Sequence, residues 1–247
     1  MKLTLAEPKY LKDSIAVISE LVSEARFSIK KEGIEVIAMD PANVAMVIFK
    51  LLPSSFTEYN VDEPVEIGVN LNTFKQFLKR SKPTDIVTLA LDDNKLKIVL
   101  KSNSTRTFHL PIIDMDEGEQ KIPDLNFPVS VIIDSMLLTE AIEDAAVVAE
   151  SVAFILEKEK FIISAEGDLS KAKVEMLNGD DCKIIQETED RIRAKYSVEY
   201  LKRMITASKL ADTVTINFNN DYPLKMEYKT VDRLSLAFIL APRVEND

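Results

Sequence analysis

The segment FSIKKEGIEVIA, residues 27–38, recurs 127 positions later as FILEKEKFIISA, residues 154–165. In both copies apolar residues gather on either side of a charged turn, which is the pattern of two strands joined by a short connection. Gly33 lies in the first turn, where glycine can adopt positive φ without steric cost. Self-similarity over so long a period indicates tandem structural units. We therefore expect two similar domains in one chain.

The same offset continues outward from this segment without a gap. It superimposes apolar residues spaced three or four apart, as in amphipathic helices, and predicts helices near residues 11–22, 71–80, 136–149 and 198–209. Near the end of the chain an offset of 128 fits better, with Leu96 on Leu224. Strand-like segments fill the intervals. Each copy is thus predicted to contain two helices and about eight antiparallel strands in an α+β fold.

Residues 114–124 separate the two copies and carry five acidic residues and one lysine. So acidic a stretch between two regions of apolar pattern is typical of a solvated connector. We place the first domain at residues 1–113, the connector at residues 114–127 and the second domain at residues 128–247.

Composition narrows the classes of function. The chain has 247 residues, with 1 cysteine, 1 histidine and 5 glycines. These counts argue against a multi-cysteine metal centre and a glycine-rich phosphate loop, and we predict neither a metal nor a cofactor. No apolar run approaches the roughly 20 residues of a membrane span, so we expect no membrane partner and an intracellular location. The net charge of -10 argues against a protein that grips nucleic acid over its whole surface.

One acidic pair resembles a catalytic motif. Asp180-Asp181 follows a glycine, as in the metal-binding aspartate turn of some polymerases. However, Asn178-Gly179 between two apolar segments favours a hairpin turn, which leaves the acids as exposed turn residues. An enzyme that uses Asp180 and Asp181 is therefore the least favoured hypothesis.

The remaining candidates for catalysis are weaker. Asp92-Asp93 predicts another exposed turn, and His109 alternates with apolar residues in a strand. Cys182 has no activating cluster near it in the sequence and is interpreted as a small structural side chain. We predict no catalytic residue.

Positive charge is concentrated on the polar faces of the predicted helices. In residues 71–80 the apolar side chains take one face and leave lysine and arginine on the other, and residues 198–209 repeat this arrangement. A single lysine on a helix usually serves solubility, but recurrence on corresponding helices predicts a shared basic surface. Its cations are Lys9, Lys12, Lys75, Lys79, Arg80, Lys82, Lys202, Arg203 and Lys209.

Several motifs are similar to those of one known family. They are GIEVIAMDP at residues 33–41 followed by Val44, IGVNL at residues 67–71, DYPL at residues 221–224, and LAPRVE at residues 240–245. On these motifs the chain resembles the archaeal-type proliferating-cell nuclear antigen (PCNA) family of DNA sliding clamps along essentially its whole length.

The resemblance implies that antiparallel sheets lie outside and that two helices of each domain line a central channel. It implies a ring with two further subunits, identical or different, that encircles duplex DNA without reading its sequence and acts as a processivity factor. The implied partners are DNA polymerase, clamp loader, flap endonuclease and DNA ligase, which bind through short peptides. The implied location is the cytoplasm, at the nucleoid, in an archaeon, and the nucleus in a eukaryote.

The resemblance also assigns the basic helix surface to DNA and two further surfaces to proteins. Strands near residues 105–112 and 170–177 correspond to the subunit-joining edges of the family, and an unpaired edge is a template for another chain. The implied subunit interface is Thr105, Arg106, Thr107, Phe108, His109, Leu110, Lys171, Ala172, Lys173, Val174 and Glu175. The implied pocket for partner peptides is Met39, Asn43, Val44, Met46, Ile122, Pro123, Pro223, Leu240, Ala241, Pro242 and Arg243.

Two departures from the family pattern affect these expectations. The third helix offers acidic residues and no lysine, which weakens the expectation that all four helices contact DNA. Gln120 stands where many relatives have an aliphatic residue, so the connector side of the peptide pocket is expected to be less apolar. The second hypothesis is a protein–protein scaffold that does not encircle DNA.

Overall fold

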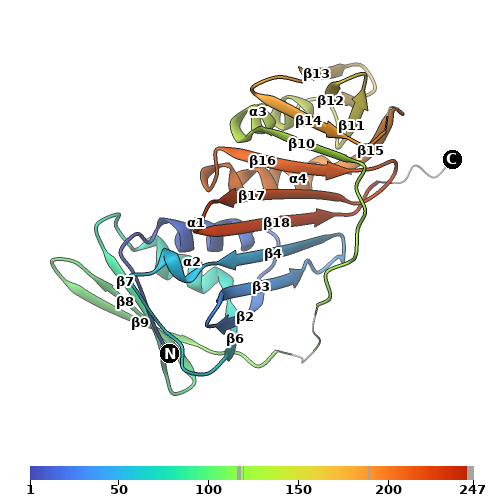
Figure 1. Cartoon of the computed structure of the whole chain (residues 1–247). Helices are drawn as coiled ribbons and strands as arrows, with labels where there is room; N and C mark the ends of the chain where they lie inside the picture. The colour runs from blue at the N-terminus through green and yellow to red at the C-terminus, as the bar shows by residue number, and fades with distance from the viewer. Residues whose placement is uncertain (116–117, 119, 189, 244–247) are drawn as a thin grey trace. The chain divides into compact units, whose positions relative to one another are not determined.

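A computed structural model describes residues 1–115, 118, 120–188 and 190–243 of the chain (Figure 1). The chain divides into two compact units. Unit 1 comprises residues 1–41, 47–122 and 229–236, and unit 2 comprises residues 42–46, 123–228 and 237–247. Strands β4 (Ala45–Leu51) and β18 (Leu234–Leu240) each contribute residues to both units.

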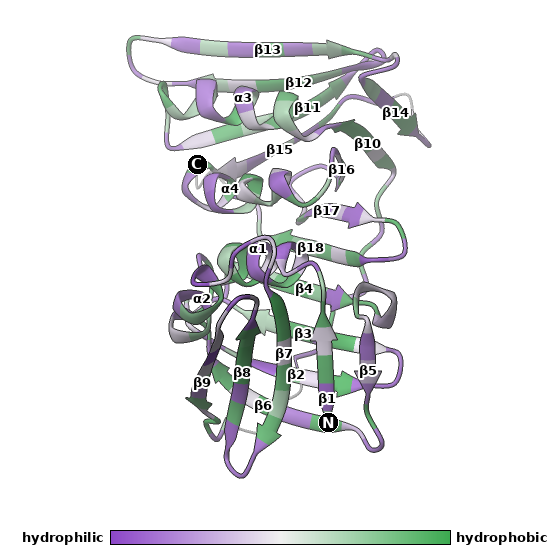
Figure 2. Ribbon diagram, turned by 90° about the vertical axis from the view of Figure 1, so that its left-hand side faces the viewer, coloured by the Kyte–Doolittle hydropathy of each residue, from purple (hydrophilic) through white to green (hydrophobic). Residues whose placement is uncertain are grey.

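Unit 1 contains an antiparallel sheet with the strand order β5-β1-β7-β8-β9, whose strands lie side by side in Figure 2. The inward residues of β7 and β8 are buried and alternate with more exposed ones, as the period of two along a strand requires. The strands are β1 (Lys2–Leu5), β5 (Glu58–Asn60), β7 (Ile86–Asp92), β8 (Lys95–Lys101) and β9 (Thr105–Pro111).

The other strands of unit 1 follow the order β4-β3-β2-β6. The quoted segment forms β2 (Glu24–Lys30) and β3 (Gly33–Met39), which pair through Ile29 opposite Ile34. Strand β6 (Val65–Asn70) pairs with the other side of β2, and a short 3₁₀ helix covers Pro53–Ser55.

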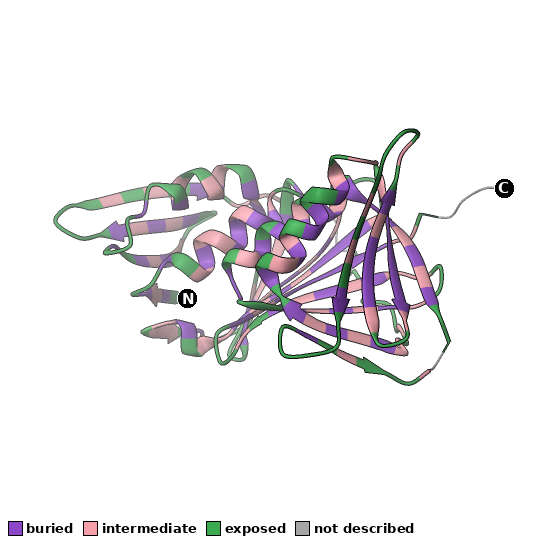
Figure 3. Cartoon of the chain, turned by 90° about the horizontal axis from the view of Figure 1, so that it is seen from above, coloured by how far each residue is buried: buried purple, intermediate pink, exposed green. Residues whose placement is uncertain are grey.

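Two helices pack against each other in unit 1, and each has a buried stripe and an exposed stripe (Figure 3). Helix α1 (Lys9–Ile18) buries Leu11 and Ile15. Helix α2 (Leu71–Lys79) is preceded by Asn70, whose side chain accepts a hydrogen bond from the Thr73 amide at 3.0 Å and caps the helix. Phe74 of α2 meets Phe27 of β2 edge to face, which anchors the helix on its sheet.

Unit 2 repeats this arrangement. One group of strands follows the order β14-β10-β16-β17 and another the order β13-β12-β11-β15. Adding nine to each strand number converts the orders β5-β1-β7-β8 and β4-β3-β2-β6 of unit 1 into these two orders. The strands are β10 (Val129–Asp134), β11 (Ser151–Glu157), β12 (Lys160–Glu166), β13 (Lys171–Leu177), β14 (Cys182–Gln186), β15 (Ile192–Ser197), β16 (Thr213–Phe218) and β17 (Leu224–Thr230). The predicted α+β fold with two similar domains is confirmed.

The core of unit 2 is built around Phe154, which is fully buried. Its ring makes edge-to-face contacts with Phe161 and Tyr196 at centroid distances of 5.4 Å and with Phe218 at 6.2 Å. Because these four rings come from four strands, they join the two groups of strands. Burial raises the pKa of the Tyr196 hydroxyl, which donates to the Tyr222 carbonyl at 2.8 Å.

The helices of unit 2 are shorter than the sequence predicts. Helix α3 (Ser135–Ala146) is capped by the Asp134 carboxylate, which accepts from the Met136 amide at 2.8 Å. Helix α4 (Val198–Met204) passes into a 3₁₀ segment at Ile205–Lys209 instead of continuing as α-helix. Apolar spacing cannot separate the two because a 3₁₀ turn also places residues three apart on one side.

The predicted hairpin at Asn178-Gly179 is wrong. Strand β13 pairs with β12 and strand β14 pairs with β10, so the chain leaves one sheet and enters another at this turn. The Asn178 side chain accepts from the Ile184 amide at 3.0 Å and closes the turn locally. Turn residues predict only that the chain reverses locally. Which strand each flanking segment pairs with depends on how its apolar side chains pack in the core.

Among the described residues, no helix is long and apolar enough to cross a membrane.

Gly33 is the residue on which the β2–β3 turn depends. Its φ is +138°, and a Cβ built on it would lie 2.6 Å from the Leu51 carbonyl oxygen. Gly33→Ala should lower the free energy of unfolding by about 1–3 kcal/mol, because the turn must adopt a strained φ and move away from β4. Urea unfolding measures this loss. Gly179→Ala is the control, since its Cβ would meet no atom closer than 4.0 Å; equal losses in the two variants would contradict the argument.

Candidate nucleic-acid and protein interfaces

The predicted basic surface lies on α1, α2 and the loop after α2 in unit 1. Lys9, Lys79, Arg80 and Lys82 are exposed there. Lys12 is half-buried, and its ammonium donates to the Ser81 carbonyl at 3.2 Å. This end of α2 therefore gathers several cations, which suits contact with phosphates.

Lys75 differs from the other cations of unit 1. Its ammonium lies 2.6 Å from a Glu20 carboxylate oxygen, and its side chain is largely covered. An anion that approaches Lys75 must compete with this carboxylate. The sequence identified Lys75 as an outward cation but could not identify its partner, which lies in the turn after α1.

The helices of unit 2 are less basic. Lys202 and Lys209 are exposed, whereas Arg203 forms an ion pair with Glu199 and lies 5.5 Å from the centre of the Tyr200 ring. Helix α3 contains no cation and exposes Glu140, Glu143 and Asp144. Its surface is therefore unsuited to phosphate, in line with the departure seen in the sequence.

Strand β9, which carries the first part of the predicted subunit interface, is the last strand in the order of its sheet. Thr105, Thr107 and His109 are exposed on its outer side, where His109 Nε2 lies 3.3 Å from a carboxylate oxygen of Asp92, the last residue of β7. The ring of Phe108 points the other way and stacks on Phe77 of α2, with centroids 4.8 Å apart. Leu110 is buried.

Arg106, assigned to the interface by resemblance, does not project from the edge. Its guanidinium forms an ion pair with the fully buried Asp85 carboxylate and donates to the Arg80 carbonyl at 2.8 Å. Asp85 was missed at the sequence level. A signal was present, because Arg106 alternates with Phe108 and Leu110 on the inward side of the strand, where a cation needs a buried acid.

Strand β13, the second predicted edge, is also the last strand in its order. Lys171 pairs with Glu166 of β12 and Lys173 pairs with Glu175 of its own strand. Hydrogen bonds from these lysines hold the pKa of both carboxyl groups below the usual value. Ala172 and Val174 are half-buried on the side of α3, and Leu177 is 66% exposed.

The internal repeat gives each of these edges a counterpart within the chain. By strand order, β9 corresponds to β18 and β13 corresponds to β4. The counterparts run antiparallel to each other, because the Leu52 amide donates to the Arg233 carbonyl at 2.8 Å and the Ala241 amide donates to the Val44 carbonyl at 2.9 Å. A strand equivalent to β9 thus already pairs with a strand equivalent to β13.

Part of the predicted peptide pocket lies at a groove of about 680 Å³ in unit 1. Met39 lines this groove together with Gln120 and other connector residues. The start of the connector is fixed there, since the Arg26 guanidinium donates to the Met115 carbonyl and the Ile113 amide donates to the Gly68 carbonyl, both at 3.0 Å. Acidic side chains of Glu24, Glu35, Glu66 and Asp114 make the groove more polar than the predicted pocket.

The predicted pocket residues of unit 2 differ in accessibility. The hydrogen bond between Val44 and Ala241 holds two of them together, and Pro223 and Pro242 are half-buried. Asn43 and Pro123 are exposed. Met46 and Leu240 are buried in the core, so their side chains do not form an open pocket surface.

Two further predicted pocket residues lie elsewhere. Ile122, at the end of unit 1, is 49% exposed, which is unusual for an isoleucine. Arg243 is exposed and lines a cavity of about 530 Å³ with Lys202 and the end of α3. It therefore adjoins the basic face of α4.

The motifs weighed as catalytic remain without a site among the residues that the structure describes. No group of three or more metal-binding side chains occurs in that part of the chain, and Asp180 and Asp181 lie exposed in the turn before β14. Cys182 is buried, which raises the pKa of its thiol and makes it unreactive.

A tandem repeat of this α+β unit, with β9 and β13 last in their strand orders and cations on the helices, defines a protein with the DNA clamp fold. The chain belongs to the PCNA family: residues 1–120 match the model of its N-terminal domain and residues 121–243 match the model of its C-terminal domain. The boundary between the two matches falls inside the acidic connector.

Relatives and solved structures agree with this assignment. The chain is 39% identical over 238 residues to the DNA polymerase sliding clamp of Thermococcus gammatolerans, covering 96% of each chain. It is 36% identical over 247 residues to that of Nanoarchaeum equitans, covering 98% of this chain and 99% of the relative. The crystal structure of PCNA from Thermococcus kodakaraensis superposes with a TM-score of 0.91 at 28% identity, covering 98% of this chain and 99% of that one.

Gly68 is the contact point between β6 and the connector. A Cβ on this residue would lie 2.3 Å from the Ile113 carbonyl oxygen and 2.8 Å from Cγ of Met115. Gly68→Ala should therefore detach the start of the connector, and amide hydrogen exchange at Ile112–Asp114 should become at least about tenfold faster, since the protected amide loses its acceptor.

Gly118→Ala serves as the matched control, because its Cβ would meet no atom within 4 Å. Unchanged exchange at Ile112–Asp114 in Gly68→Ala would show that the connector is not held at this point.

Proposed function

We propose that this protein is a DNA sliding clamp: three subunits close into a ring around duplex DNA and tether DNA polymerase to it. The observation that carries the proposal is the pairing of β4 with β18. Because β13 and β9 are their counterparts in the repeat and lie at the ends of their sheets, a second copy can continue the same pattern through them.

The charge distribution supports a central passage for DNA. The net charge is -10, yet α1, α2 and α4 each expose basic side chains. Such cations meet phosphates without reading bases, and the contact weakens steeply with salt. An acidic exterior repels DNA, so retention depends on the closed ring rather than on affinity. The acidic face of α3 makes unit 1 the main DNA-contacting part of each subunit.

Partner proteins are proposed to dock through short peptides with apolar anchors. Exposed Ile122 and half-buried Met39 provide apolar surface for such anchors, and methionine side chains can repack for different partners. DNA polymerase, the clamp loader, flap endonuclease and DNA ligase are the proposed partners, and loading requires the ring to open.

The first test distinguishes encirclement from surface binding. Clamp loaded onto nicked circular DNA should remain bound during gel filtration at about 0.2 M salt, and linearising the circle should release nearly all of it, because only topology retains it. Equal retention on circular and linear DNA would contradict encirclement. No retention on either form, together with intact binding of partner peptides, would favour the scaffold hypothesis.

The second test concerns the register between subunits. The repeat offset of 127 carries Val44 and Leu52 to positions 171 and 179, beside β13, and the offset of 128 carries Ala241 and Arg233 back to positions 113 and 105, beside β9. In this antiparallel register Thr107 of one subunit lies opposite Leu177 of the next. Both residues are exposed on the outer sides of their strands. Directly opposite residues have Cβ atoms about 4.5–5.5 Å apart, within reach of a disulfide.

Thr107→Cys combined with Leu177→Cys should therefore form covalent trimers in mild oxidant, detected on a non-reducing gel. Thr107→Cys combined with Lys173→Cys is the matched control, since it is displaced by four residues along the same side of β13. Trimers from the control pair alone would overturn the proposed register, and cross-linking in neither pair would contradict the β9–β13 interface.

A further inference from the structure

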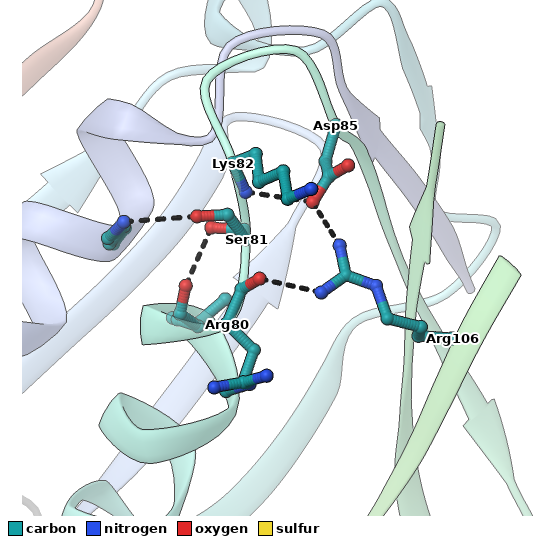
Figure 4. A network of polar contacts seen from close by, with 7 residues as sticks. Arg80, Ser81, Lys82, Asp85 and Arg106 are labelled. Carbon is teal, nitrogen blue, oxygen red and sulfur yellow. Dashed lines mark hydrogen bonds and ion pairs between the residues drawn. The ribbon is translucent and has the colours of Figure 1, made fainter. Parts of the chain in front are cut away.

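A network of polar contacts surrounds one buried carboxylate at the end of α2, and it joins Arg106 to the backbone of Arg80 and to Asp85 (Figure 4). The Arg106 guanidinium, from β9, contacts the Asp85 carboxylate and donates to the Arg80 carbonyl at 2.8 Å. The same Asp85 oxygen accepts from the Lys82 amide at 2.8 Å, and the Lys12 ammonium donates to the Ser81 carbonyl at 3.2 Å. The network thus joins α1, α2, the loop after α2 and β9.

Asp85 is the centre of this network. It has no exposed surface, and the Asp85 amide also donates to the Lys82 carbonyl at 3.0 Å, so that residues 82–85 form a closed turn. The Lys82 amide, the Ser102 side chain and the Arg106 guanidinium hold the pKa of the carboxyl below its usual value. A buried carboxylate of this kind is tolerated only while its partners remain in place.

Arg106 connects the Asp85 carboxylate and the Arg80 carbonyl through two different nitrogens of one rigid guanidinium. Its planar fork reaches a carboxylate with one nitrogen and a carbonyl at the end of a helix with the other. The cation also lies at the negative end of the α2 dipole, which is favourable. A lysine at this position carries the charge but is a single point donor.

Strand β9 depends on this attachment because it is an edge strand. In the described part of the chain its strand partner is β8, and its inward side chains rest on α2 through Arg106 and through Phe108 on Phe77. Strand addition by another chain is favoured when the edge is already ordered, since the ordering cost is then absent from association.

We propose that Asp85 is a positioning residue for self-association: from beneath β9 it holds Arg106 against α2 and keeps the edge in the form that a second copy of this chain pairs with. The inference rests on the proposed function, in which β9 joins the next subunit. Arg106 then acts inside its own subunit, and Asp85 matters to an interface that it cannot touch.

The experiment compares Asp85→Asn and Arg106→Lys with the wild type and with Glu58→Gln. Glu58 pairs with Lys2 at 2.8 Å at the opposite edge of the same sheet, so its variant removes an ion pair without affecting β9. Analytical ultracentrifugation over a dilution series measures the trimer–monomer equilibrium, and amide hydrogen exchange of the monomer measures the order of residues 105–110.

Asp85→Asn and Arg106→Lys should each shift the dilution midpoint for dissociation at least about tenfold upward. They should also speed exchange in β9 while leaving exchange in β2, β3 and unit 2 unchanged, and Glu58→Gln should match the wild type. The double variant should be no worse than the more affected single variant, because both changes break one network.

The proposal would be overturned if Arg106→Lys dissociated at the same dilution as the wild type and exchanged its amides at the same rate. It would also be overturned if association weakened while hydrogen exchange in β9 stayed unchanged. If Asp85→Asn fails to fold, Arg106→Lys, which retains the charge, still decides between these outcomes. A wild type that never forms trimers would refute the proposed function itself, which separates that failure from a failure of this inference.

Discussion

The backbone hydrogen bonds of two strands, β9 and β13, are the constraint on which the rest of the structure depends. Each strand lies at the end of its sheet, so one row of amides and carbonyls lacks a strand partner among the described residues. Water can satisfy these groups, but a flat, ordered edge is also open to any compatible strand. Both edges are selective, because β9 turns its aromatic Phe108 and its Leu110 inward and β13 carries its charges in local ion pairs.

The location of charged residues, and not the net charge, determines where this protein can attract a polyanion. The same chain that carries -10 overall collects cations at one end of α2 and leaves α3 acidic. Electrostatic attraction between exposed charges fades within about 10 Å at ordinary salt. A local basic surface can therefore attract a polyanion although the molecule as a whole repels it. The pairing of Lys75 with Glu20 and of Arg203 with Glu199 moderates that attraction, which suits a contact that must not arrest movement.

Most of the fold could be predicted from the sequence because the repeat exposes the same core pattern twice. Helices and long strands follow from apolar spacing, whereas β1 and β5 are too short to show a period, and the partner of β14 depends on the core. The basic residues of the helices were identifiable by type. Their individual roles were not, since Lys75 and Arg106 meet acids that lie 55 and 21 residues away in the sequence. The inward position of Arg106 indicates that it needs a buried acid, but the spacing does not say which acid it is.

The division of β4 and β18 between the two units has a consequence for where such a ring opens. The junction made by these strands lies within one covalent chain and cannot be lost by dilution. A junction of β9 with β13 has the same strand chemistry but no peptide bond across it. In the proposed ring only the β9–β13 junctions between chains can open, and there is one such junction for each chain. Two similar domains in one chain thus halve the places at which the proposed ring can break.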